Sequence, residues 1–264
     1  MKRIASIHLL VAGGVMIFLN SCYPSSTIPD PYYVSQDRQK ENYYYLPPAA
    51  NAPLLTEKGD VSATFMASSG KTASGAEIQA AGLPSKHIGV LASFSTGTNK
   101  SSKEDYTKHH QFELGAGYVT KFAHIWSFET YGGWGSGDVS NRHHTGSSKI
   151  NANHFFLQPT IAVANKNRTV QLGMISKFSG VTSNMKYTFF DKDREQFSAA
   201  QIAALEDEPF HLMWEPGIAF RAGWRNVLFN AQYSHSSDLT NENLHREKDN
   251  FSLGIILKFN AITD

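Results

Sequence analysis

Histidine is the first residue type here that could do chemistry, because eleven are present and several stand in adjacent pairs. The pairs His109-His110 and His143-His144 fall in or beside stretches that we expect to be loops. Neighbouring imidazoles could bind a transition metal or haem if those loops came together. The pairs lack the fixed spacing of a metal motif, and solvated loop residues are the simpler interpretation. We therefore expect no cofactor and keep these four histidines as weak metal candidates.

Signatures of enzymes are missing from the sequence. It contains no nucleophile elbow, phosphate-binding loop or dinucleotide-binding context. The glycine-rich stretch 132–137 ends a predicted strand instead of opening a helix. We therefore predict that the protein is not an enzyme.

Composition excludes several other classes of protein. A hydrophobic content of 41% argues against intrinsic disorder, and a mean hydropathy of −0.33 argues against a polytopic helical membrane protein. The net charge of +1 gives no excess for binding nucleic acid. The single cysteine excludes an intramolecular disulfide and any site built from paired cysteines.

That single cysteine, Cys22, follows a short basic start and an apolar run over residues 4–19. This layout is typical of a secretory signal, and the run is short for a helix that spans a membrane. The residues Leu19-Asn20-Ser21-Cys22 resemble the lipobox of bacterial lipoproteins, which implies cleavage before Cys22 and its acylation. The alternative is an ordinary signal peptide with a chance cysteine. We predict a lipoprotein signal over residues 1–21 and an acylated (palmitate-bearing) Cys22.

Residues 22–58 are rich in proline and tyrosine, which favours an extended spacer over helix or sheet. We predict that this stretch is a tether, either with its tyrosines stacked on a surface or as a poorly ordered linker. No acidic cluster follows Cys22, so the expected place of the anchor is the periplasmic leaflet.

Residues 59–264 alternate between apolar and polar with the period of β-strands. The pattern predicts an all-β domain, an antiparallel up-and-down barrel of about ten strands, with eight as a variant. The apolar sets lie at 61–67, 76–80, 88–94, 112–118, 126–134, 155–163, 170–178, 212–220, 227–233 and 251–259.

Charged residues occupy the opposite face of these strands. In a soluble barrel the apolar face is buried, whereas in a membrane barrel it meets lipid and the polar face lines the lumen. We predict the membrane arrangement and a polar network that fills the lumen, with Glu215 and Arg221 among its central members. The predicted lumen residues are Glu77, Glu113, Glu129, Lys177, Glu215, Arg221 and Lys258.

Tryptophan spacing and the lengths of the connections favour the membrane arrangement. All four tryptophans, Trp126, Trp134, Trp214 and Trp224, share the apolar face, and their spacing fits two aromatic girdles about 25 Å apart. Short connections alternate with long ones at 97–107, 137–148, 181–209 and 237–247. An even strand number places both termini on the periplasmic side. Within the longest connection, a capping box at Ser198 predicts a short helix from Ala199 to about Asp207.

The entry into the first strand, Asn51 to Gly59, and the closing Gly254 to Phe259 resemble small outer-membrane β-barrel lipoproteins of Gram-negative bacteria. Most members of that family are uncharacterised, so the resemblance implies a fold and a location more than an activity. We predict a lipid-anchored outer-membrane barrel with a structural or surface-interaction role. Its partners would be outer-membrane lipid and an unidentified surface or periplasmic protein. The alternatives are a narrow solute pore (porin-like) and a lipid-modifying enzyme active at the rim, where His154 or His235 could act with a serine.

Overall fold

A computed structural model describes residues 45–70, 73–100, 106–122, 125–143, 146–190, 210–224, 226–240 and 246–260. The predicted signal, Cys22, His144 and the predicted helix in 199–207 lie outside the described residues, as does the side chain of His143. Among the described residues, no helix is long and apolar enough to cross a membrane.

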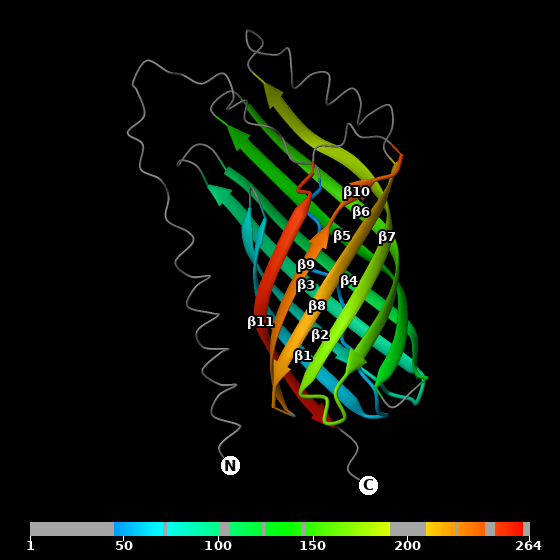
Figure 1. Ribbon diagram of the computed structural model, residues 1–264. Helices are drawn as coiled ribbons and strands as arrows, with labels where there is room; N and C mark the ends of the chain where they lie inside the picture. Colours follow the sequence, from blue (N-terminus) through cyan, green and yellow to red (C-terminus); the bar gives the residue numbers. More distant parts are fainter. Residues whose placement is uncertain are drawn as a thin grey trace, which may run out of the picture. The chain divides into compact units, whose positions relative to one another are not determined.

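Strands make up nearly all of the described chain (Figure 1). Their bounds are β1 Asp60–Gly70, β2 Ser74–Gly82, β3 Ile88–Lys100, β4 Tyr106–Lys121, β5 Trp126–His143, β6 Gly146–Ala164, β7 Val170–Phe190, β8 Phe210–Gly223, β9 Val227–His235, β10 Ser237–Asp238 and β11 Asp249–Asn260.

The strands close into one antiparallel barrel. Each strand from β1 to β8 pairs with the next, β9 pairs with both β8 and β11, and β11 pairs with β1. β10 continues the line of β9 after Ser236 and also pairs with β8. With β9 and β10 counted as one, the described residues form ten strands, so the predicted barrel of ten strands is confirmed.

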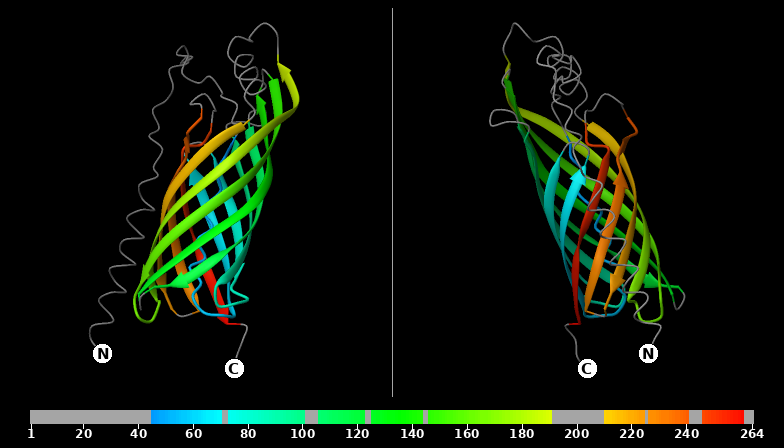
Figure 2. Two further views of the ribbon diagram at one scale, coloured as in Figure 1. Left: turned by 90° about the vertical axis from the view of Figure 1, so that its right-hand side faces the viewer. Right: turned by 60° about the vertical axis from the view of Figure 1, so that its left-hand side comes forward.

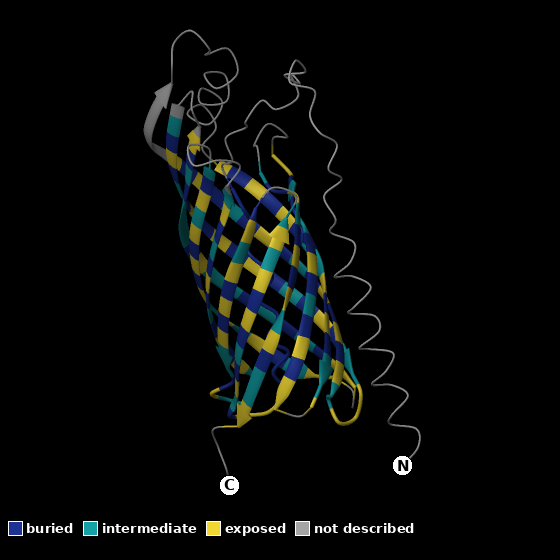
Figure 3. Cartoon of the chain, turned by 90° about the vertical axis from the view of Figure 1, so that its left-hand side faces the viewer, coloured by how far each residue is buried: buried dark blue, intermediate teal, exposed yellow. Residues whose placement is uncertain are grey.

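Burial alternates residue by residue along the barrel wall and gives a checkerboard (Figure 3). The apolar set faces outward, as in Phe155 at 72% exposure and Ile255 at 51%. The inward positions carry buried polar side chains such as Glu113 and Gln158. The arrangement therefore has its apolar coat on the outside and its polar residues in the lumen, as the tryptophan spacing and the connection lengths predicted.

The two ends of the barrel differ (Figure 2). The turn end carries the connections 83–87, 122–125, 165–169 and 224–226, the start of β1 and the end of β11. The loop end carries the connections 71–73, 101–105, 144–145, 191–209 and 239–248.

Predicted long connections at 97–107 and 137–148 are mostly strand, which corrects the sequence interpretation. β3 runs on to Lys100 and β5 to His143, and β7 reaches 21 residues against 9 for β2. The extensions of β3 and β5 are mostly polar on both faces, so they show no clear alternation, but each pairs with its neighbour through a continuous antiparallel ladder. The longer wall that they build stands at the loop end.

Candidate functional site

Residues 45–55, which we call the lumen segment, run through the inside of the barrel. Each of them is buried. The Tyr45 carbonyl accepts a hydrogen bond from the Glu247 amide at the loop end, and Leu55 packs against Leu83 at the turn end. The lumen segment therefore crosses the barrel from one end to the other before Gly59 leads into β1.

The composition of the lumen segment suits a narrow polar interior. Pro47, Pro48 and Pro53 favour an extended chain and carry no amide hydrogen that would need a partner. Ala49, Ala50 and Ala52 have small side chains, so lumen side chains can approach the backbone. The sequence predicts the extended shape of this stretch but does not predict its place inside the barrel.

Lumen side chains bind the backbone of the lumen segment near Ala49 and Asn51. The Glu77 carboxylate accepts a hydrogen bond from the Ala49 amide at 2.8 Å. The Gln158 amide accepts from the Asn51 amide at 3.2 Å and donates to the Asn51 carbonyl at 2.6 Å. This two-way contact satisfies both backbone groups of one extended residue.

A second set of contacts follows towards the turn end. The Arg221 guanidinium donates to the Pro53 carbonyl at 2.8 Å and to the Ala52 carbonyl. The Leu54 amide donates to the Glu129 carboxylate at 3.2 Å. Leu54 has a φ of 50°, and this bend lets Leu54 and Leu55 pack into two different apolar clusters of the lumen wall.

An ion cluster centred on Glu113 lies beside the middle of the lumen segment. Glu113 Oε1 lies 2.5 Å from Lys177 Nζ and 2.8 Å from His154 Nε2, and Glu113 Oε2 accepts from Asn51 Nδ2 at 2.8 Å. Glu215 Oε2 lies 4.0 Å from the same Lys177 Nζ. One buried lysine therefore faces two buried glutamates.

Glycine opposite His154 makes room for this cluster. Gly135 on β5 pairs with His154 on β6, and a Cβ at Gly135 would collide with the imidazole ring. The missing side chain thus lets the histidine lie flat enough along the wall to reach Glu113.

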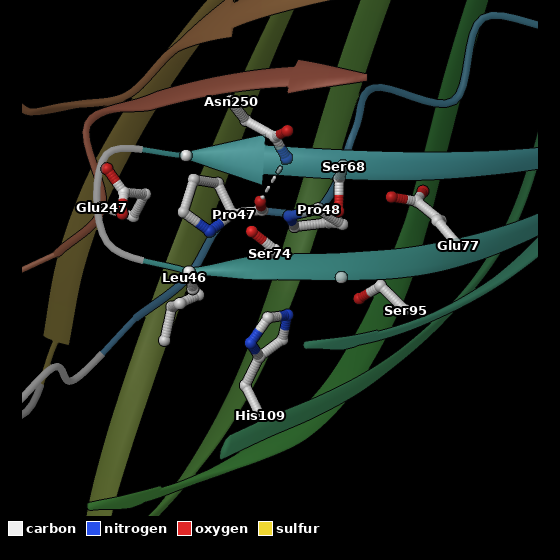
Figure 4. Close-up of a pocket in the computed structure, with 13 residues that line it drawn as sticks. Leu46, Pro47, Pro48, Ser68, Ser74, Glu77, Ser95, His109, Glu247 and Asn250 are labelled. Atoms are coloured by element: carbon white, nitrogen blue, oxygen red, sulfur yellow. Dashed lines mark hydrogen bonds between the residues drawn. The ribbon is translucent and has the colours of Figure 1, made fainter. Parts of the chain in front are cut away.

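Free space in the lumen is small. The cavity at the loop end, lined by Pro47, Pro48, Glu77 and His109 among others, holds about 20 Å³ (Figure 4). A second one between Asn51 and Leu91 holds about 10 Å³. Each of these two cavities therefore has room for about one water molecule.

The structure places six of the seven predicted lumen residues in full burial, and Lys258 is half-buried with its Nζ 3.5 Å from Gln171. They form two groups instead of one. Glu113, Lys177 and Glu215 come together, whereas Arg221 binds the lumen segment. Glu215 and Arg221 are six residues apart on β8, roughly 20 Å along the strand, so they share a face without meeting.

Of the other predicted residues that the structure describes, His154 lies in the ion cluster and His109 lines the loop-end cavity of the lumen. All four tryptophans point outward, at 38% to 71% exposure. His110 is exposed and His109 half-buried, while His235 pairs with Asp249 at 2.9 Å near the loop end. Within the described parts of the chain, no group of three or more His, Cys, Asp or Glu is placed to hold a metal ion.

We expect Gln158→Glu to destabilise the barrel by about 1–3 kcal/mol, because a carboxylate cannot donate to the Asn51 carbonyl. The matched control is Gln171→Glu, at a lumen glutamine whose side chain bonds to Lys258 and to the Arg168 carbonyl instead of the lumen segment. Urea unfolding in detergent micelles measures both. Equal losses of unfolding free energy in the two variants would mean that the contact between Gln158 and the lumen segment does not stabilise the barrel more than an ordinary lumen hydrogen bond.

Comparison with known proteins gives likenesses of fold. The translocator domain of the autotransporter NalP from Neisseria meningitidis matches with a TM-score of 0.46 and 10% identity, over 77% of this chain and 89% of that one. Ail, the attachment invasion locus protein of Yersinia pestis, matches with a TM-score of 0.31 and 13% identity, over 77% and 100%. No family model and no curated protein matches the sequence.

Proposed function

We propose that the chain is a bacterial outer-membrane β-barrel, anchored by an acylated Cys22, whose own lumen segment keeps the barrel closed. Its role is then structural or interactive, carried by the loop end, and neither transport nor catalysis. The observation that carries this proposal is the lumen segment itself, held from end to end by buried side chains.

The outer surface supports a place in lipid. Its apolar side chains continue around all the strands, from Phe65 on β1 to Ile255 on β11. Apart from the two-residue β10, the shortest strands are β2 and β9, with 9 residues each. At ~3.3 Å per residue and a tilt of ~40°, such strands rise roughly 23 Å, close to the ~25 Å apolar band of outer-membrane barrels.

The contacts inside the barrel support the proposal of a closed barrel and argue against a pore. A pore needs a continuous water-filled path, and here the path is occupied by backbone, by alanine and proline side chains, and by a polar network bonded to them. Glu113 pairs with Lys177 and Arg221 donates to Asn230 on the wall, which a water-filled lumen would not require.

Fractionation tests the location. We expect the protein in the outer-membrane fraction, with a folded form that migrates differently on a gel until it is boiled. A Cys22→Ala chain should keep that behaviour, because the barrel alone inserts. A Cys22→Ala chain that is soluble and shows no mobility shift would contradict the proposal that the barrel lies in the outer membrane.

We expect Leu157→Arg to destabilise the barrel in vesicles by about 2–4 kcal/mol, because a cation in the middle of the apolar band meets lipid. Leu157 lies on β6 with its side chain 55% exposed. The control is Asn167→Arg in the exposed connection 165–169, expected within about 0.5 kcal/mol of the parent. Urea unfolding from vesicles compares them, and equal stability of the two variants would place the outer surface in water.

A further inference from the structure

We propose that the chain before Tyr45 leaves the barrel at the loop end, so that an acylated Cys22 is held in the surface leaflet of the outer membrane. This inference rests on the proposed function for the membrane and the anchor. It departs from the expectation that both termini are periplasmic. The C-terminal strand does finish at the turn end, at Asn260, but the described chain begins at the opposite end.

The order of contacts along the lumen segment fixes its direction. Tyr45 pairs with Arg246 in the loop-end connection 239–248, and the Pro47 carbonyl accepts from Asn250 at the start of β11. Asn51, in the middle of the lumen segment, contacts Glu113 about halfway along β4. Leu55 and Gly59 contact Leu83 at the turn end. Figure 4 shows Leu46, Pro47 and Pro48 beside the loop-end tip of the β1–β2 hairpin.

A return of the preceding chain to the turn end is unfavourable by either of the two routes, through the lumen or along the outer surface. The lumen is filled by the lumen segment, with cavities of about 20 Å³ or less on either side. The outer surface of the barrel would be covered by lipid, where unpaired backbone groups each cost several kcal/mol. Residues 23–44 are also poorly suited to lipid, because they contain Pro24, Pro29 and Pro31 and the charged residues Asp30, Asp37, Arg38, Lys40 and Glu41.

The chain between Cys22 and Tyr45 is long enough to reach surface lipid. Twenty-three residues span at most about 80 Å when extended and roughly 25 Å as a flexible coil. The distance needed is the wall of one strand layer, about 10 Å, plus the height of the rim. A chain of this length that leaves the barrel at the loop end can therefore reach lipid outside the rim.

Epitope tags at three sites test this arrangement in intact cells. One tag follows Ser26, one lies within the connection 191–209, and one follows Asp264. Antibody labelling is compared before and after the outer membrane is permeabilised. We expect the Ser26 and 191–209 tags to be labelled on intact cells and the Asp264 tag to require permeabilisation.

Each of the other results overturns a different statement. A Ser26 tag that needs permeabilisation, beside a labelled 191–209 tag, refutes the surface tether and leaves the proposed membrane orientation standing. A 191–209 tag that needs permeabilisation, beside a labelled Asp264 tag, refutes that orientation. Heat-modifiability on a gel is checked first for every tagged chain, so that only folded barrels are compared.

A cleavable tether locates the acyl group itself. A protease recognition site is inserted after Gln36, and cells are fed an alkyne fatty acid that labels acylated protein. Protease added to intact cells should separate the label from the barrel band completely. A barrel band that loses its label only after permeabilisation refutes the surface anchor, whereas a parent chain without any label refutes the acylation of Cys22.

Discussion

Removal of the lumen segment should turn a silent barrel into a conducting one. In planar bilayers, the parent chain is expected to show no channel, because residues 45–55 and the side chains around them fill the lumen. A chain that lacks residues 23–55 is expected to give discrete single-channel steps. The deletion leaves β1 and every wall contact between strands intact, since β1 begins at Asp60.

The opened lumen should prefer cations. Four buried glutamates, Glu77, Glu113, Glu129 and Glu215, face three lysines and arginines on the described wall: the buried Lys177 and Arg221 and the half-buried Lys258. Water that enters the deletion variant would solvate these groups and expose a net negative lining. Reversal potentials in a salt gradient measure this preference, and an anion preference would contradict the charge balance of the lumen.

The matched control for this deletion lacks residues 23–42 and keeps the whole lumen segment. It should be as silent as the parent chain, which separates the effect of the lumen segment from that of the tether. Both variants must first show the gel shift of a folded barrel. A folded chain without residues 23–55 that stays silent would show that the wall side chains alone close the barrel.

Local pattern was enough to predict the wall of this barrel. Alternation predicted the ten strands and placed Glu113 and Lys177 on one shared face, because side chains along a strand alternate between its two faces. The tryptophan spacing and the connection lengths then indicated that this face lines the lumen. The same rule missed the strand extensions around 137–148, where both faces are polar. There the strands are held by pairing with neighbours, which leaves no mark on hydropathy.

The lumen segment could not be read in the same way, because its partners are distant in the chain. Asn51 binds Gln158, 107 residues away, and Pro53 binds Arg221, 168 residues away. A run of proline and alanine is equally compatible with an exposed linker. The sequence offers one indirect signal. The predicted lumen face carries four glutamates against three cations, and two of these glutamates, Glu77 and Glu129, accept hydrogen bonds from the lumen segment.

The ion cluster shows the same dependence on distant residues, and it carries the second large effect. Lys177→Met is expected to destabilise the barrel by about 3–5 kcal/mol, measured by urea unfolding in micelles. Methionine keeps most of the volume and removes the charge. Glu113 and Glu215 then face each other in a buried site without the lysine that lies 2.5 Å from one and 4.0 Å from the other.

Two further variants separate charge from packing. Lys177→Met combined with Glu113→Gln removes the lysine and the nearer of its two glutamates, so it should recover part of the loss, because only Glu215 is then left without the cation. Lys121→Met removes an exposed pair with Glu57, at 3.5 Å and with side chains 33% and 65% exposed, and should cost about 0–1 kcal/mol. The ring centre of Phe156 lies 5.0 Å from Lys177 Nζ. If the double variant were as unstable as Lys177→Met alone, the loss would come from packing against this ring and not from carboxylates that have lost their lysine. Recovery in the double variant would instead show that the two glutamates are held in the lumen by one shared cation.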